Sequence, residues 1–123
     1  MIYKSKLWIN DIDTIIETLP ELSAFNGKSV MITGAAGLIC SSVIDILIRY
    51  NEAYGGNVKI IGAGRWLEEM INRFGAYCDK KYFEFVVYDA SRPDNNFDVD
   101  ADYIIHGASN AFPALIIKEP VET

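Results

Sequence analysis

The chain has 123 residues, of which 50% are hydrophobic and 23% charged, and its formal net charge is −6. This length suits one domain with a single core and is too short for a cofactor domain followed by a substrate domain. The acidic balance, without any run of Lys or Arg, argues against nucleic acid and anionic membranes as partners and leaves small molecules.

The N-terminal segment lacks the apolar run of a signal peptide or a membrane-spanning helix. Charged residues interrupt it at Lys4, Lys6, Asp11 and Asp13. We therefore expect a cytoplasmic protein. Cys40 and Cys78 lie far apart, and no Cys or His spacing suits zinc, so we expect two reduced, structural cysteines and no metal site.

The predicted elements begin with an N-terminal helix and connector over residues 1–27. Apolar residues at helical spacing indicate a helix over 11–19, which an Asn10-Asp11 cap signal opens and Pro20 closes. The connector follows over 21–27. Residues 28–123 are interpreted as the second unit, an α/β domain.

This unit opens with a short apolar strand over 28–33 and a helix over 37–50. The apolar face of that helix is predicted to hold Leu38, Val43, Ile46, Leu47 and Tyr50. A second strand over 57–62 and a second helix over 66–74 follow. The helix carries an apolar stripe that we interpret as core, formed by Leu67, Met70, Ile71 and Phe74.

The last predicted elements are a third strand over 83–88, a polar loop over 91–98 and a fourth strand over 102–106. The alternation of strands and helices predicts an α/β fold, with a Rossmann-type, mostly parallel sheet, flanking helices and the strand order 3-2-1-4. We expect this sheet to be incomplete. Its free edge predicts self-association, through residues 103–105 or through 111–117.

The segment Thr-Gly-Ala-Ala-Gly-Leu over residues 33–38 joins the first strand to its helix. Gly34 permits a backbone angle that a side chain would forbid, and Gly37 lets the main chain approach a pyrophosphate closely. Amide N–H groups and the positive end of the helix dipole would then hold the charge. No Gly-Lys-Ser/Thr follows, which excludes a P-loop. The pattern therefore predicts a dinucleotide cradle.

From about residue 26 onward the sequence resembles the extended short-chain dehydrogenase/reductase family. The likeness is to nucleotide-sugar epimerases and dehydratases of the dTDP-glucose dehydratase and UDP-glucuronate decarboxylase kind. Four segments carry it in the family's order: Thr-Gly-Ala-Ala-Gly-Leu-Ile-Cys over 33–40, Tyr-Asp-Ala over 88–90, Asp-Tyr-Ile-Ile-His-Gly-Ala-Ser over 102–109 and Lys-Glu-Pro-Val-Glu-Thr over 118–123.

The resemblance implies a role in binding NAD or NADP for three groups of residues. Around the pyrophosphate it places Gly34, Ala36, Gly37, Leu38 and Ile39. At the adenine it places Asp89 and Ala90, with Asp89 accepting a hydrogen bond from the amino group. Beneath the ribose and the nicotinamide it places Gly107, Ala108 and Ser109. For Asp89 a plain turn residue is the alternative interpretation.

Two positions depart from the family pattern. The third position of the glycine motif holds Cys40, which is larger than the usual Gly or Ala, and we expect a small outward shift of the helix without loss of the site. The second strand ends in Gly-Ala-Gly-Arg over 62–65, without the carboxylate that NAD-specific members offer to the ribose 2′-hydroxyl. Arg65 would suit the 2′-phosphate of NADP, or it is a solvated residue at the helix start.

The function expected from this resemblance is that of the cofactor-binding N-terminal part of a nucleotide-sugar epimerase or dehydratase. The family's catalytic Tyr-x-x-x-Lys pair is not identified, so we expect a catalytically incomplete chain that meets a nucleotide sugar only in a longer form. The alternative is a stand-alone dinucleotide-binding or sensing module without catalysis. His106, the one histidine of the sequence, is interpreted as closing a strand end, and Trp8 and Trp66 as packing residues.

Overall fold

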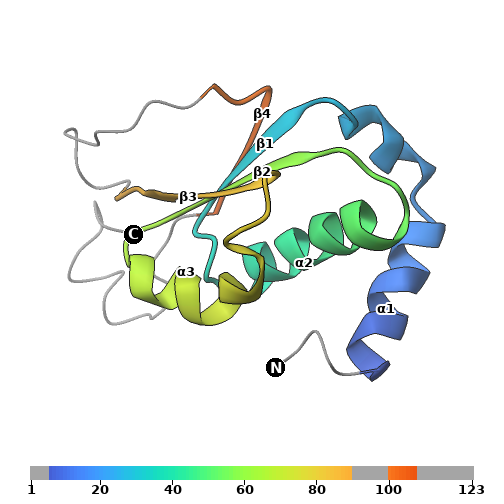
Figure 1. Ribbon diagram of the computed structural model, residues 1–123, viewed down its shortest axis with the longest axis horizontal. Coiled ribbons are helices and arrows are strands. Elements are labelled where there is room, and N and C mark those ends of the chain that lie inside the picture. The colour runs from blue at the N-terminus through green and yellow to red at the C-terminus, as the bar shows by residue number, and fades with distance from the viewer. Residues whose placement is uncertain (1–5, 90–99, 108–123) are drawn as a thin grey trace.

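The computed structural model of the protein describes residues 6–89 and 100–107 (Figure 1). Its elements are, in chain order, α1 (Lys6–Glu17), the 3₁₀-helix η2 (Pro20–Phe25), β1 (Ser29–Thr33), α2 (Leu38–Ala53), β2 (Lys59–Gly64), α3 (Leu67–Phe74), the 3₁₀-helix η3 (Gly75–Tyr77), β3 (Phe83–Val87) and β4 (Tyr103–His106). Within these ranges no helix has the length and apolar character needed to cross a membrane.

The four strands form one all-parallel sheet in the order β3-β2-β1-β4. This confirms the predicted fold class and strand order. Thr33 is in register with Ala63 of β2 and with His106 of β4, and Gly64 is in register with Val87 of β3. The carboxyl ends of all four strands therefore meet at one edge of the sheet, which we call the carboxyl edge.

The helices α1, α2 and α3 lie on one side of the sheet (Figure 1). Apolar side chains of α1, α2 and α3 share one core cluster with side chains of β1, β2 and β3. Fully buried members include Ile32, Ile44, Ile60, Met70 and Phe74. Each such side chain stabilises the fold by about 1.5–3 kcal/mol relative to an exposed one.

A second, smaller apolar cluster lies on the opposite face of the sheet. It consists of Met31, Ile61, Ala63 and Val86, with Tyr88 and Ala101 packed against them. Successive side chains of a strand point to opposite faces, so Ile32 lies in the main cluster and its neighbour Met31 in the smaller one. In the part of the chain that the structure describes, no helix contributes to this second cluster.

The buried side of α2 differs from the predicted one. Leu38 is 86% exposed, whereas Cys40, Ser41, Ile44, Asp45, Leu47 and Ile48 are buried. The buried arc is broad because α2 contacts both the sheet and α1. Leu38, in the first turn, lies beyond the carboxyl edge. The stripe on α3 is likewise only half in the core, since Met70 and Phe74 are buried while Leu67 and Ile71 are partly exposed.

The N-terminal segment is more helical than predicted. α1 begins at Lys6, so the expected cap at Asn10-Asp11 lies inside it, and the expected connector contains η2. The early start brings Trp8 to α2, where its indole N–H donates to Asp45. This tertiary contact outweighs the local cap signal. Ile12, Ile16 and Leu22 join the main core cluster, so this segment packs as part of the α/β unit.

Strand β2 is displaced by two residues from its predicted range. The amide of the Asn51 side chain bonds both the N–H and the C=O of Val58, at 3.0 and 2.8 Å, which ties Val58 to α2 instead of the sheet. At the other end the strand continues through Ala63 and Gly64, both buried. Arg65 therefore directly follows the strand, at the carboxyl edge.

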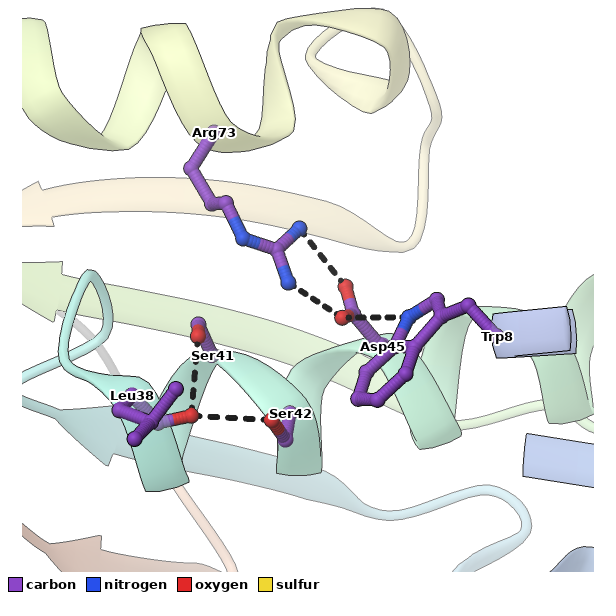
Figure 2. A network of polar contacts seen from close by, with 6 residues as sticks. All are labelled: Trp8, Leu38, Ser41, Ser42, Asp45 and Arg73. Atoms are coloured by element: carbon purple, nitrogen blue, oxygen red, sulfur yellow. Dashed lines mark hydrogen bonds and ion pairs between the residues drawn. The ribbon is translucent and has the colours of Figure 1, made fainter. Parts of the chain in front are cut away.

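A buried ion pair joins the helices (Figure 2). Asp45 on α2 is fully buried and receives two hydrogen bonds from the guanidinium of Arg73 on α3, one of them from Nη1 to Oδ1 at 3.0 Å. The indole of Trp8 on α1 donates to Oδ2 of the same carboxylate at 3.2 Å. Three helices thus meet at one side chain. Hydrophobic periodicity could not reveal this contact.

The expectation of self-association stays a prediction. β4 lies at one end of the strand order, and its Tyr103, Ile104 and Ile105 are between 40% and 63% exposed. The alternative surface, residues 111–117, lies outside the described residues, as does the predicted polar loop.

Candidate functional site

The glycine turn between β1 and α2 lies at the centre of the carboxyl edge. Gly34 has a φ of +71°, a conformation that side chains rarely adopt. The N–H of Gly37 donates to the C=O of Gly34 at 2.9 Å, and the N–H of Ala35 donates to Ala63 of β2 at 3.1 Å. A Cβ at Gly37 would lie 3.1 Å from the Gly34 oxygen. Gly34 is thus needed for the shape of this turn, whereas a side chain at Gly37 would require only a small adjustment.

The turn delivers the chain into the N-terminus of α2. Gly37 is the N-cap, and in the described residues no side chain caps it. The first turn of a helix has N–H groups without intrahelical partners, and the helix dipole places partial positive charge there. Ala36 and Gly37 are exposed, and so are Leu38 and Ile39, at 86% and 77%. This end of α2 therefore offers amide donors and apolar contact to a ligand.

The N-terminal part of α2 approaches the end of β4 closely. A Cβ at Gly107 would lie 2.2 Å from Sγ of Cys40 and 3.1 Å from the C=O of Thr33. The bulk of Cys40 is therefore accommodated by the absence of a side chain at Gly107. Burial raises the pKa of the Cys40 thiol, which suits its predicted structural role. The expected outward shift of the helix stays a prediction. Cys78, by contrast, is exposed.

Substituting Gly107 tests this packing. We expect Gly107→Ala to lower the free energy of unfolding by about 1–3 kcal/mol, because the added methyl group overlaps Sγ of Cys40. Cys40→Ala removes that sulfur, so the double variant should regain most of the loss. Urea unfolding of the two single variants and the double variant gives the coupling energy. If the losses of unfolding free energy in the two single variants simply add in the double variant, the side chain at position 107 does not clash with Cys40.

The next strands place Arg65 and Asp89 at the same edge. Arg65 is half-buried, and its guanidinium carbon lies 6.0 Å from the ring centroid of Trp66. The N–H of Tyr88 donates to the C=O of Gly64 at 2.8 Å, which brings the half-buried Asp89 beside the end of β2. Thus Gly34 to Ile39, Arg65, Asp89 and Gly107 share the carboxyl edge. Ala90, Ala108 and Ser109 lie outside the described residues.

Two adjoining clefts run along α3 at this edge. The larger has a volume of about 530 Å³ and is lined by Arg65, Trp66, Leu67, Glu68, Glu69, Asn72 and Val87. The smaller, of about 440 Å³, is lined by Ala36, Glu69, Asn72 and Arg73. Because Glu69 and Asn72 line both, the two clefts are neighbours on α3, one beside Ala36 of the glycine turn and the other beside Trp66.

Trp66 is not the packing residue that the sequence suggested, because it is 61% exposed. Sequence reasoning also missed Glu69, Asn72 and Val87 as lining residues. A usable signal existed only for Trp66, which stands next to Arg65 at the end of a strand. The others lie in the predicted helix or strand, and nothing in the pattern marks them as facing a cleft.

His106 is tied to the neighbouring strand. Its Nδ1 lies 2.8 Å from Oγ1 of Thr33, which also accepts a hydrogen bond from the N–H of Gly107 at 3.0 Å. The ring of Tyr88 meets the imidazole edge-on, with 6.5 Å between centroids. These contacts fix the imidazole at the junction of β1 and β4.

A Tyr-x-x-x-Lys spacing does occur, at Tyr77 and Lys81, and the sequence interpretation overlooked it. Tyr77 lies in η3, which follows α3 and so stands at the far end of that helix from the carboxyl edge. Burial, and then the charge of Glu52, raise the pKa of its hydroxyl, which is the opposite of what a catalytic base needs. This pair therefore does not supply the family's catalytic residues.

The sequence matches no model of a known protein family, and no curated protein matches it. The fold is Rossmann-like, a parallel α/β sheet with the strand order 3-2-1-4.

Proposed function

We propose that this chain binds NAD or NADP across the carboxyl edge, as the cofactor-binding part of a nucleotide-sugar epimerase or dehydratase. The observation that carries the proposal is the position of the glycine turn. The chain runs outward from β1 through β2 to β3 and then returns to β4 on the other side of β1, so the strand order reverses beside β1. In open parallel sheets, ligands bind at such a switch point, outside the carboxyl ends of the strands.

The chemistry of the turn supports a pyrophosphate as the group bound there. The two negative charges of a pyrophosphate must be neutralised without a basic side chain. The N-terminus of α2, which no side chain within 6–89 and 100–107 caps, supplies amide donors and a positive dipole. The absence of a side chain at Gly37 leaves room for a close approach. The adenosine half would then lie toward Arg65 and Asp89, and the nicotinamide half toward Gly107.

The cofactor, when bound, would accept and return a hydride. The described residues supply its binding surface, and we assign none of them to proton transfer in that reaction. The chain is therefore proposed to be catalytically incomplete, with the nucleotide sugar engaged only in a longer form. A dinucleotide-binding or sensing module without catalysis is the alternative, and it would use the same site.

The substitution Arg65→Ser tests whether Arg65 favours the binding of NADP over NAD. If Arg65 pairs with the 2′-phosphate, NADP should bind the variant about tenfold to a hundredfold more weakly, the loss of roughly 1.5–3 kcal/mol expected for a hydrogen bond to a charged group. NAD lacks this phosphate, so its affinity for the variant should fall much less than that of NADP. Calorimetric titration of the wild type and the variant with NAD and with NADP measures the change in affinity for each ligand. An equal change in the affinities for NAD and NADP would show that Arg65 does not bind the 2′-phosphate.

A further inference from the structure

Trp66 presents an unusual exposed aromatic surface at the carboxyl edge. Trp66 is 61% exposed and lines the larger cleft, beside the partly exposed Leu67 and Val87. Large exposed apolar side chains gathered at a concave surface mark a ligand contact more often than chance exposure does. The guanidinium of Arg65 stands over the indole at 6.0 Å, within the range of a cation–π contact that orients the ring.

The charges of this cleft restrict what can enter it. Arg65 contributes one positive charge, while Glu68 and Glu69 contribute two negative charges. Away from Arg65, a phosphate would meet the negative charges of Glu68 and Glu69, whereas a neutral ring with exocyclic donors would not. A purine with an amino group has the flat face that an indole stacks on and the N–H donors that carboxylates accept.

The positions of the two neighbouring clefts restrict how a ligand that contains such a ring could lie. Glu69 and Asn72 line both clefts, and Ala36 of the glycine turn lines the smaller one. A ligand whose anionic group lies at the N-terminus of α2 can therefore extend along α3 to Trp66. The larger cleft, at about 530 Å³, is within the usual size range for a bound small molecule.

We propose that Trp66 is the stacking platform for the adenine of the bound dinucleotide. This inference rests on the proposed function and adds to it a specificity-determining residue. The indole stacks on the purine, Arg65 orients the indole, and Glu68 and Glu69 favour a base that carries an amino group over an anion.

Tryptophan fluorescence tests this directly. The sequence has two tryptophans, so a Trp8→Phe background leaves Trp66 as the single reporter. Titration of that protein with AMP, NAD or NADP should quench its emission, whereas nicotinamide mononucleotide should not. In the same background Trp66→Ala should weaken AMP and dinucleotide binding, measured by calorimetry, about tenfold to a hundredfold, as expected when a stacking aromatic is removed. Trp66→Phe should retain most of the affinity.

The controls separate this inference from the proposed function. Ile71→Ala is a matched substitution of an exposed apolar residue on α3 that does not line either cleft, and it should leave both affinities unchanged. If the wild-type chain binds neither NAD nor NADP, the proposed function fails and this inference fails with it. If the wild type binds a dinucleotide and Trp66→Ala binds it equally well, only the stacking role of Trp66 is overturned.

Discussion

Arg73→Met should lower the free energy of unfolding by about 3–5 kcal/mol, the range for breaking a buried ion pair by removing one partner. The carboxylate of Asp45 is fully buried and would lose both guanidinium hydrogen bonds and the opposite charge. The indole N–H of Trp8 cannot replace them, because it brings no charge. For a domain whose total stability is about 5–15 kcal/mol, such a loss is a large fraction.

The matched control is Arg49→Met, the same substitution at the pair between α1 and α2. Arg49 Nε lies 2.9 Å from Oδ1 of Asp13, but these side chains are 35% and 24% exposed. Arg49 lowers the pKa of Asp13 through a hydrogen bond, yet a pair this exposed should contribute at most about 1 kcal/mol. Urea unfolding compares the two variants. A loss at Arg73 no larger than the loss at Arg49 would contradict the assigned importance of the buried pair.

Gly37→Asp should reduce dinucleotide affinity at least about a hundredfold, which corresponds to about 2.8 kcal/mol. Its carboxylate would stand at the N-terminus of α2 and take the amide donors that the pyrophosphate needs. The fold should survive, because the φ of −68° at Gly37 allows a side chain and Asp is a favourable N-cap residue. The Cβ, 3.1 Å from the Gly34 oxygen, requires only a small adjustment of the turn.

Gly37→Asn separates charge from size at this position. Asparagine caps a helix about as well as aspartate and has nearly the same shape, but it adds no negative charge. We expect its loss of affinity to be clearly smaller than that of Gly37→Asp, and both variants to unfold within about 1 kcal/mol of the wild type. Equal affinity of Gly37→Asp and the wild type for NAD and NADP would show that the helix N-terminus does not hold the pyrophosphate.

The sequence predicted the parallel sheet because local signals and the global fold agree. The apolar run of β1, the positive-φ position at Gly34 and the alternation of strands and helices all indicate one arrangement, and the strand order is confirmed. Element bounds were less well predicted where a distant side chain decides them. Asn51 delays the start of β2 through its bonds to Val58, and Trp8 extends α1 toward Asp45.

From backbone geometry, only part of the candidate site could be predicted. Gly34 and Gly37 follow from the turn, whereas Arg65 and Gly107 were indicated by comparison with the family that the sequence resembles. The exposure of Trp66 and the matching of Cys40 with Gly107 depend on how elements pack, and no local pattern encodes packing. The core face of α2 was wrongly predicted at Leu38 for the same reason, since a buried Asp45 occupies part of the true core face.

The most direct test of the central claim is a thermal-shift titration of the chain with NAD and with NADP. A ligand that binds only the folded state at a hundredfold its Kd adds about 2.7 kcal/mol to the stability. For a chain of this size, that raises the Tm on the order of 10 °C. We predict a rise with at least one of the two ligands, and a larger rise with NADP if Arg65 holds the 2′-phosphate. An unchanged Tm with both ligands at millimolar concentration would contradict the proposal that this carboxyl edge is a dinucleotide site.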